Sequence, residues 1–368
     1  MEVTPLERVE FDAGILMRSH PPEWRNEHKR LVFEISTSSG FPHKGTVVYA
    51  RWGEEQAPST VTARPQFSVR LGAFDYAAST DPSTIPWYLN FADPQLFVAY
   101  GSALMAQDEL QVAEHPILGS LLEALLSMGK RPVTVDERGR PTPVTVTGAE
   151  RRCVIDTMPK PAAGRPGGLY GNAFARAPSE NIRSATTPLT PPTISNILAI
   201  AAGVGGRGQY SREEMVYVLN TAYTGFSAAR RESERLDPDC SRTVIHTGFW
   251  GCGAFGGNRT LMTILQALAA DLADVDVVFW ALNERGVELA RDARGRYEGL
   301  RDSTSSVAEV VGCLLGEGFQ WGSPMGIEVC PCKAQTWRSP GMLAPPQPDS
   351  AAARSGSVPL AVTITMCS

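Results

Sequence analysis

The chain has 368 residues, of which 43% are hydrophobic, and its formal net charge is −5 at pH 7. This length allows a large buried core, in one elaborated domain or in two. Because the net charge is negative and no run of Lys or Arg stands out, we expect neither nucleic acid nor an anionic membrane as a partner. An anionic ligand would then have to be held by backbone amides.

The cysteines and the N-terminus indicate the redox state, the metal content and the location to expect for the protein. The seven cysteines have no paired spacing, and Cys330-Pro331-Cys332 lacks the two-residue gap and the second ligand pair of a zinc site. We therefore expect reduced thiols and no metal. Because the N-terminus has no signal-peptide pattern and no stretch approaches the apolar length of a membrane span, we expect a cytoplasmic protein.

The first part of the chain reads as short mixed elements. Apolar, β-branched runs predict strands at 31–35 and 45–50, and composition favours a further strand at 96–100. Apolar residues at helical spacing predict a helix over 117–128. Two more short strands are predicted at 144–146 and 153–155.

Residues 158–208 differ in character, since prolines and glycines are frequent there and only 194–200 looks ordered. Excursions of this kind are usually functional lids or disordered loops. The chain then returns to regular structure at Ser211, which forms a capping box with Glu214 and predicts a helix running towards Tyr223.

The following residues alternate between strand and helix. We predict a strand at 243–247, a glycine-rich loop at 247–258, a helix from Arg259 to Leu272 capped by Asn258, a strand at 275–281 and a helix at 307–315. This alternation predicts an α/β three-layer domain, in which ligands gather at the carboxyl ends of the strands.

The loop at 247–258 is the most informative segment, because five of its twelve residues are glycine. A glycine-rich turn between a strand and a helix brings backbone amides close to a ligand, with the positive end of the helix dipole behind them. This arrangement suits a phosphate or pyrophosphate. The alternative is a tight turn that only connects two packed elements.

A second candidate is the acidic triplet Gln107-Asp108-Glu109. Burial of either carboxylate would raise its pKa towards a value useful to a general acid. Neighbouring helix positions point about 100° apart, so the two carboxylates should have separate roles. One could protonate a departing group and activate water while the other anchors a sugar hydroxyl. The alternative is a solvated helix face.

Four segments in the same order carry a resemblance to a known family. The loop Thr-Gly-x-Trp-Gly-Cys-Gly-Ala-Phe-Gly-Gly, with the Leu-rich helix and Val-Val-Phe strand after it, resembles poly(ADP-ribose) glycohydrolases. Residues 89–93 before the acidic triplet, 151–156 and 219–226 also match. The resemblance implies a macrodomain-like α/β fold, a three-layer mixed sheet flanked by helices. Its core would span 85–320 and include the insertion 158–208, between an N-terminal accessory segment (1–84) and a C-terminal extension (321–368).

The resemblance also implies residue roles. Glu109 would be the catalytic acid/base of an oxocarbenium-like cleavage, Asp108 would orient ribose hydroxyls, and Gln107 would support them. Asn90 and Asp93 would contact substrate, and Phe255 would pack near the ribose beside the scissile bond. The remaining loop residues would wrap the diphosphate: Gly248, Phe249, Trp250, Gly251, Cys252, Gly253 and Ala254. No cofactor is implied.

The chain departs from the family on the ribose side. Phe97-Val98-Ala99 stands where the family has three glycines, and Phe249 stands where it usually has Asn. Tyr170, Asn172 and Phe174 of the insertion could supply a new wall. We therefore expect a hydrolase in NAD metabolism that cleaves the glycosidic bond of a single ADP-ribosyl group or an NAD-derived nucleotide. The alternatives are a small-molecule biosynthetic enzyme and a non-catalytic ADP-ribose-binding module.

Overall fold

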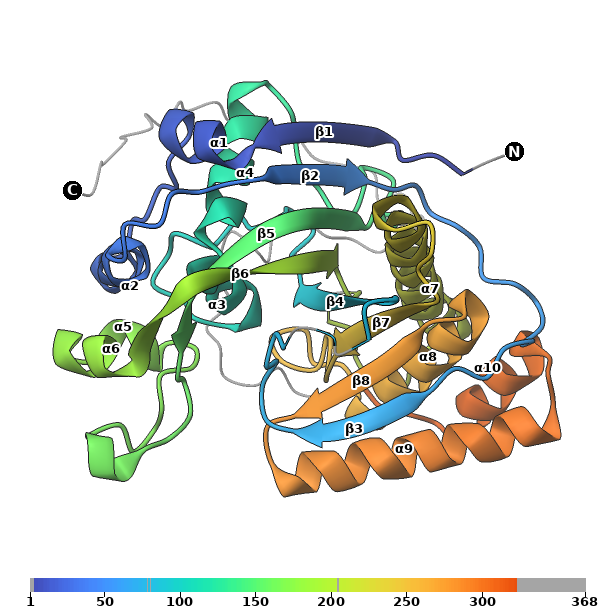
Figure 1. The fold of residues 1–368 in the computed structure, drawn as a ribbon. Coiled ribbons are helices and arrows are strands. Elements are labelled where there is room, and N and C mark those ends of the chain that lie inside the picture. Colours follow the sequence, from blue (N-terminus) through green and yellow to red (C-terminus); the bar gives the residue numbers. More distant parts are fainter. Residues whose placement is uncertain (1–2, 78, 80, 204, 323–368) are drawn as a thin grey trace, which may run out of the picture. The chain divides into compact units, whose positions relative to one another are not determined.

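The computed structural model describes residues 3–77, 79, 81–203 and 205–322, and its central feature is an eight-stranded sheet (Figure 1). The strand order is β1-β2-β5-β6-β4-β7-β8-β3. The strands are β1 (Glu7–Asp12), β2 (Thr46–Arg51), β3 (Phe67–Leu71), β4 (Thr84–Phe91), β5 (Val144–Ile155), β6 (Thr186–Ile200), β7 (Arg242–Thr247) and β8 (Asp276–Ala281). The half from β6 to β3 is parallel, and β1, β2 and β5 continue it in antiparallel pairing.

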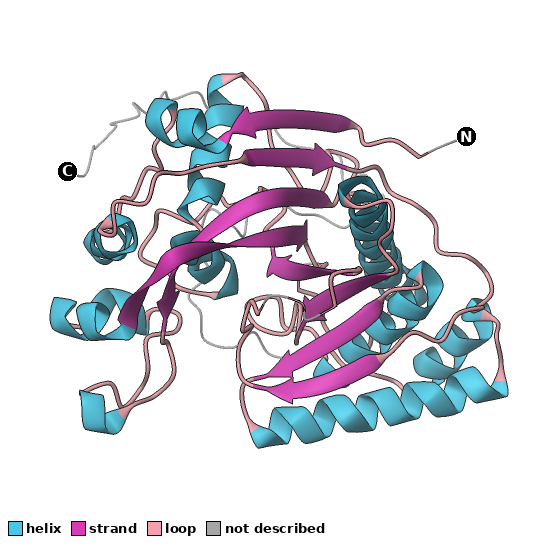
Figure 2. Ribbon diagram, in the orientation of Figure 1, coloured by secondary structure: helices cyan, strands magenta, loops and turns pink. Residues whose placement is uncertain are grey.

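Helices cover both faces of this sheet (Figure 2). They are α1 (Ala13–Ser19), α2 (Glu27–Thr37), α3 (Gln107–Glu114), α4 (Pro116–Ser127), α5 (Ala173–Arg176), α6 (Ser179–Ala185), α7 (Arg212–Leu236), α8 (Arg259–Ala273), α9 (Glu284–Ser303) and α10 (Val307–Gly316). Among the described helices, none is long and apolar enough to cross a membrane.

Side-chain alternation along the strands explains the layers. In β6, Leu198 and Ile200 belong to the core shared with α7 and α8, whereas Ile197 and Ala199 belong to the core shared with α1 and α4. Successive residues of a strand point to opposite faces, so a strand with no polar alternation is buried on both sides. The predicted mixed α/β fold with helices on both faces of the sheet is confirmed.

Helix caps that the sequence predicted are present. The Ser211 hydroxyl accepts from the Glu214 amide and the Glu214 carboxylate accepts from the Ser211 amide, so α7 starts at a complete capping box. Asn258 caps α8 by accepting from the Leu261 amide. The helix α7 continues to Leu236, well beyond Tyr223, and its buried residues extend as far as Ser233.

The predicted strand at 31–35 is wrong, since these residues lie in α2. The Asn26 side chain accepts from the amides of His28 and Lys29 and so caps a helix start. The buried positions of α2 include Lys29, Leu31 and Val32, a helical spacing that outweighs the β-branched composition of the run.

The predicted strand at 96–100 is also wrong, because the chain there forms turns between β4 and α3. Phe97 has a φ of 53°, and the amide of Tyr100 donates to the Phe97 carbonyl in a turn. An extended strand has negative φ, so the left-handed conformation of Phe97 excludes one.

Two segments are more regular than the sequence suggested. The segment 158–208 holds the helices α5 and α6 as well as β6, whose ordered part begins at Thr186 rather than at 194. Residues 1–84 contribute β1, β2 and β3 to the common sheet. The C-terminal extension from residue 323 onward, with the Cys330-Pro331-Cys332 motif, lies outside the described residues.

Candidate functional site

A cavity of about 1050 Å³ lies where the carboxyl ends of the parallel strands β3, β7 and β8 meet one face of α3. One side of it is lined by residues that follow β3 and β7 and by residues at the end of β8: Gly72, Ala73, Phe74, Tyr76, Gly248, Phe249, Cys252, Gly253, Trp280, Leu282 and Asn283. The other side is formed by α3, the end of β5 and part of the 158–208 segment. Ligand sites of open α/β sheets occupy this position.

Backbone geometry requires the glycines of the loop. A Cβ atom on Gly248 would lie 2.8 Å from the Trp280 carbonyl oxygen. Gly251 has a φ of 73°, and a Cβ there would lie 2.6 Å from the Ala202 Cβ. Both positions therefore exclude larger residues, and the loop runs close against β8 and the end of β6.

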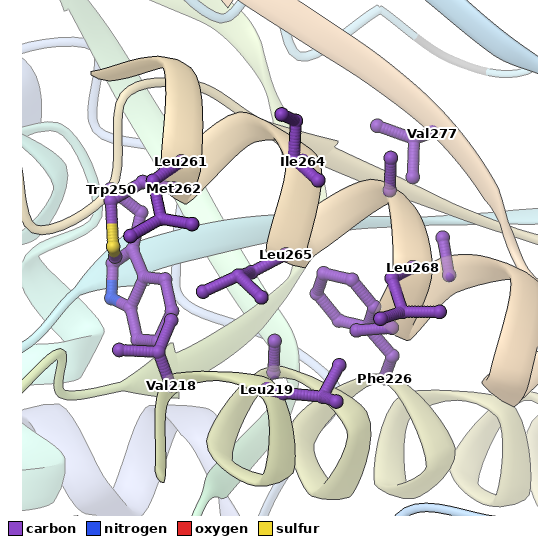
Figure 3. Close-up of a cluster of buried hydrophobic side chains, with 14 of the residues drawn as sticks. Val218, Leu219, Phe226, Trp250, Leu261, Met262, Ile264, Leu265, Leu268 and Val277 are labelled. Atoms are coloured by element: carbon purple, nitrogen blue, oxygen red, sulfur yellow. The ribbon is translucent and has the colours of Figure 1, made fainter. Parts of the chain in front are cut away.

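Trp250 anchors the loop in the core rather than facing a ligand. Its side chain is 1% exposed, and its indole N–H donates to the Ile200 carbonyl at 3.0 Å. Figure 3 shows Trp250 at one end of the cluster formed by α7 and α8, beside Val218 and Met262. The loop position thus depends on tertiary packing.

Three consecutive amides of the loop, those of Gly253, Ala254 and Phe255, have no hydrogen-bond acceptor among the described residues. They precede α8, whose first-turn amides of Arg259 and Thr260 are unpaired in the same part of the structure. Consecutive free amides at a helix N-terminus form an anion-binding concavity. Gly253 lines the cavity wall, whereas Ala254, Phe255, Trp250 and Gly251 are not among the residues that line it.

An arginine beside these amides was not predicted from the sequence. Arg259 lines the cavity, and its guanidinium lies over the Phe249 ring with 5.0 Å between the Cζ atom and the ring centroid. No carboxylate of the described chain pairs with it. A stacked, unpaired guanidinium next to free amides adds a positive charge to the part of the cavity that could bind an anion. The sequence feature that could have predicted this role is the position of Arg259 as the first residue of a helix after a glycine-rich loop.

Cys252 also lines the cavity but is a poor nucleophile. Burial raises the pKa of its thiol to about 12, against the opposing effect of Arg259. A thiol with this pKa is protonated at neutral pH and inert. It serves as a small apolar wall residue.

Helix α3 presents one face to the cavity, formed by Gln107, Leu110, Gln111 and Glu114. At about 100° per residue these positions lie within one side of the helix, while Glu109 lies about 200° around from Gln107. Accordingly, Asp108 and Glu109 are not among the residues that line the cavity. The repeat at i, i+4 and i+7 from Gln107 was the sequence signal for Gln111 and Glu114.

The acidic triplet is fixed to β4 by hydrogen bonds. The Gln107 amide donates to the Leu89 carbonyl at 2.9 Å and accepts from the Phe91 amide at 2.7 Å, so it docks the start of α3 on the end of β4. Asn90, which is fully buried, donates to Asp108 at 3.0 Å. Asn90 therefore lies beside Asp108 rather than in the cavity wall.

Glu109 is buried at the start of α3 and pairs with its own backbone. Its carboxylate accepts from the Ala106 amide at 3.0 Å, and the residue is 1% exposed. On the neighbouring helix α2, Lys29 is fully buried and donates to the Tyr100 carbonyl at 2.5 Å. Burial lowers the pKa of Lys29 to about 8, while the charges of Glu109 and Asp108 act in the opposite direction.

A different carboxylate, Glu114, does line the cavity. It forms an ion pair with Arg151 at 2.8 Å and accepts from the Ile155 amide at 2.7 Å. Burial raises the pKa of the Glu114 carboxyl above its ordinary value, against the opposing charge of Arg151. The Arg151 guanidinium also lies 4.2 Å from the centroid of the Tyr76 ring. Sequence analysis placed Arg151 in a family-like strand but gave it no role.

The 158–208 segment contributes a wall, as expected for two of its three candidate residues. Tyr170 and Asn172 line the cavity, and the Tyr170 hydroxyl accepts from the backbone N–H of Gln107 at 3.1 Å. Phe174 is instead fully buried and packs edge-on against the His28 ring of α2. Phe174 therefore anchors the segment on α2 and does not line the cavity.

Phe97-Val98-Ala99, which the sequence analysis aligned with three glycines of the glycohydrolases, begins with a residue that is packed into the core. Phe97 is fully buried with α4 and the inner face of the sheet, despite its left-handed backbone. Asp93 accepts from the Gln95 amide at 3.1 Å, and its carbonyl accepts from Thr134 at 2.8 Å. Neither Phe97 nor Asp93 is among the cavity-lining residues. In the described chain no cluster of His, Cys, Asp and Glu has the arrangement of a metal site.

Comparison with known proteins gives a partial match. Residues 170–288 match the family described as "Poly (ADP-ribose) glycohydrolase (PARG), Macro domain fold". This stretch contains β6, α7, β7, the glycine-rich loop, α8 and β8, and it leaves out the acidic triplet. Poly(ADP-ribose) glycohydrolase 1 of Caenorhabditis elegans is 32% identical over 76 residues, which are 21% of this chain and 9% of that protein. The match therefore spans about a tenth of that relative's length.

Solved structures of the same family are also similar. The Thermomonospora curvata glycohydrolase bound to the inhibitor ADP-HPD is 16% identical, with 73% of this chain and 97% of that chain covered and a TM-score of 0.42. The Deinococcus radiodurans glycohydrolase in complex with ADP-ribose is 11% identical, with coverages of 78% and 94% and a TM-score of 0.40. The resemblance read from the sequence is confirmed by the family match: residues 170–288 of this chain are similar to the poly(ADP-ribose) glycohydrolases, which have the macrodomain fold.

Proposed function

We propose that the protein is a hydrolase that cleaves the glycosidic bond of a single ADP-ribosyl group or of an NAD-derived nucleotide. The observation that carries the proposal is the row of unpaired amides at Gly253, Ala254 and Phe255, inside the segment that matches the glycohydrolase family. Such a protein would belong to NAD metabolism in the cytoplasm, with neither nucleic acid nor membrane as a direct partner. Its catalytic core would be 85–320, with 1–84 and 321–368 as accessory segments.

The diphosphate would bind at the loop. Its two negative charges would meet the free amides, the positive end of the α8 dipole and the Arg259 guanidinium. The Gly248, Phe249, Cys252 and Gly253 wall would then exclude water from one side of the phosphates. Phe255 would lie towards the adjacent ribose.

Cleavage would need a carboxyl group at the anomeric carbon. In the family-based assignment Glu109 protonates the leaving group and then assists water, while Asp108, held by Asn90, orients ribose hydroxyls. Glu109 would have to leave its contact with the Ala106 amide to do so. Glu114 is the competing acid, because it already lines the cavity and burial raises its pKa.

The test compares Glu109→Gln with Glu114→Gln in turnover of mono-ADP-ribosylated protein and of NAD, with ADP-ribose release measured by chromatography. We expect Glu109→Gln to lower kcat by about 10²–10⁴-fold, the usual contribution of a general acid. Calorimetry with ADP-ribose checks that each variant still binds. Loss of activity in Glu114→Gln alone would transfer the role to Glu114, and wild-type turnover in both variants would refute carboxylate catalysis.

A non-catalytic ADP-ribose-binding module is the second candidate, and the buried packing of Phe97 and Glu109 favours it. Tight ADP-ribose binding by calorimetry without product from any ADP-ribosyl substrate would support this alternative.

The cavity wall added by Tyr170 and Asn172 favours a third candidate, a biosynthetic enzyme acting on an NAD-derived small molecule. Turnover of a free dinucleotide but not of modified protein would support the third.

A further inference from the structure

The carboxylates in the cavity wall are already neutralised by cations of the protein. Glu114 pairs with Arg151 at 2.8 Å. Asp156 pairs with Lys160 at 2.5 Å and with Arg165 at 3.2 Å. Neither carboxylate is therefore available to a cationic ligand, and neither offsets the charge of any further cation in the wall.

The other charged residues of the described wall are both arginines. Arg259 follows the glycine-rich loop, and Arg176 ends α5 on the side formed by the 158–208 segment. Neither guanidinium has a hydrogen-bond or ion-pair partner within the described part of the chain. Unpaired charges of one sign attract ligands of the other sign. Because the two cations belong to different walls, they suit a ligand that carries two separate anionic groups.

The short helix α5 that carries Arg176 is fixed to the body of the fold. Just before it, the Gly171 amide donates to the Met105 carbonyl at 2.8 Å. Within it, the fully buried Phe174 pairs through its carbonyl with the His28 ring at 3.1 Å. The exposed side chain of Arg176 therefore extends into the cavity from a backbone whose position is set by packing on α2.

Asn172 supplies a second polar group on the same side of α5. It precedes Arg176 by four residues and has helical dihedrals, with φ −72° and ψ −11°, so the two side chains share a helix face, and both line the cavity. The Asn172 amide also has no hydrogen-bond partner in the described chain. An amide N–H next to a guanidinium offers several donors, which suit the oxygens of a carboxylate or a phosphate.

We propose that Arg176, assisted by Asn172, binds a second anionic group of the substrate, a carboxylate or a phosphate carried beyond the diphosphate on the leaving-group side. This inference rests on the proposed function, because it places the diphosphate at the glycine-rich loop. It makes Arg176 a specificity residue, which selects substrates whose leaving group or terminal ribose carries a negative charge over neutral ones.

The experiment compares affinities within two pairs of probes by calorimetry at low temperature, with the integrity of each ligand checked by chromatography. In the first pair, nicotinic acid adenine dinucleotide carries a carboxylate where NAD has a carboxamide. In the second, ADP-ribose is compared with its derivative phosphorylated at the anomeric carbon of the terminal ribose. Wild type should bind the more anionic member of at least one pair about fivefold more tightly, as expected for a partly solvated ion pair. The pair that shows this preference identifies the carboxylate or the phosphate as the source.

Arg176→Met keeps an apolar stem and removes the charge. We expect it to bring the preferred pair within about twofold of equal affinity and to leave ADP-ribose affinity within about twofold of wild type. Arg183→Met is the matched control, because Arg183 is an exposed arginine of the next helix, α6, outside the cavity wall. It removes the same charge and should keep the wild-type preference. Arg176→Glu should reverse the preference in favour of the neutral member.

The outcomes separate this inference from the proposed function. If wild type binds no ADP-ribose, the proposed function fails and the inference falls with it. If wild type binds ADP-ribose but shows equal affinities within both pairs, or if Arg176→Met keeps the preference, the second-anion assignment alone is overturned. An equal loss of affinity for every probe in Arg176→Met would mean that Arg176 acts on the diphosphate and would also overturn it.

Discussion

The glycine-rich loop (residues 247–258), with Arg259 after it, and the acidic segment (residues 90–114) contribute to opposite sides of one cavity, but they differ in how their polar groups are used. In the loop, core packing of Trp250 fixes the backbone while three amides and Arg259 have no acceptor in the described chain. In the acidic segment Gln107, Asp108 and Glu109 all have partners within the protein. The glycine-rich loop, which would hold a ligand, therefore has free polar groups in a fixed position. The polar groups of the acidic segment, which would react with the ligand, are already hydrogen-bonded within the protein.

The largest expected effect tests how far the loop depends on the core. Trp250→Ala should lower the free energy of unfolding by about 3–5 kcal/mol, because it removes a fully buried aromatic side chain. ADP-ribose binding should be lost with it. Urea unfolding and calorimetry measure both effects.

Phe249→Ala is the matched change in the same loop, since Phe249 is half-buried and faces the cavity. It should weaken binding with a much smaller loss of stability. If Trp250→Ala left both stability and binding near wild type, core anchoring would not be what positions the loop.

The next effect concerns the charge buried behind the acidic segment. The pKa of Lys29 is about 8 in the folded protein, against 10.5 as its ordinary value. Between pH 8 and 10.5 the unfolded state binds more protons at Lys29 than the folded state, so the free energy of unfolding of wild type rises with pH in this range. Below pH 8 Lys29 is charged in both states, and the full cost of burying this charge applies. Relative to Lys29→Met, wild type should gain up to about 3 kcal/mol between pH 8 and 10.5.

Urea unfolding of wild type and Lys29→Met at pH 7, 8, 9 and 10 measures this gain. Titration of the buried tyrosines occurs in both proteins and cancels in the difference. Parallel stability curves for the two proteins would show that Lys29 has an ordinary pKa.

A somewhat smaller change in stability is expected at Phe97, in the turn between β4 and α3. Phe97→Gly relieves the left-handed backbone, which costs a bulky residue about 1–2 kcal/mol, but it empties a buried aromatic position worth about 3–5 kcal/mol. The free energy of unfolding should therefore fall by roughly 2–3 kcal/mol. A stability equal to or above wild type would mean that Phe97 is not part of the core.

The smallest expected effect is a change in ADP-ribose affinity, and it tests whether Arg259 helps the glycine-rich loop to bind an anion. Arg259→Met should weaken ADP-ribose binding about tenfold, or about 1.4 kcal/mol, and reduce its dependence on salt. Calorimetry at two salt concentrations measures both quantities. Arg285→Met, at an exposed position in α9, should change neither. An unchanged affinity in Arg259→Met would leave the anion to the backbone amides alone.

Sequence features that act over a few residues predicted the elements around the glycine-rich loop well. The glycines, the Asn258 cap and the Ser211 capping box act over a few residues, so their consequences can be read from neighbouring positions. The α2 and 96–100 regions failed for the opposite reason. There the Asn26 cap and the burial of Phe97 decided between helix, strand and turn against β-like composition.

The sequence by itself therefore determined where an anion could be held, because a glycine-rich turn before a capped helix leaves amides free by local geometry. Only the tertiary structure decided which side chains of α3 face the cavity. The side-chain amide of Gln107 docks this helix on β4, and in the resulting rotation Gln111 and Glu114 line the cavity while Glu109 does not. Helical periodicity fixes which residues share a face, but the direction of that face depends on contacts between residues far apart in the chain.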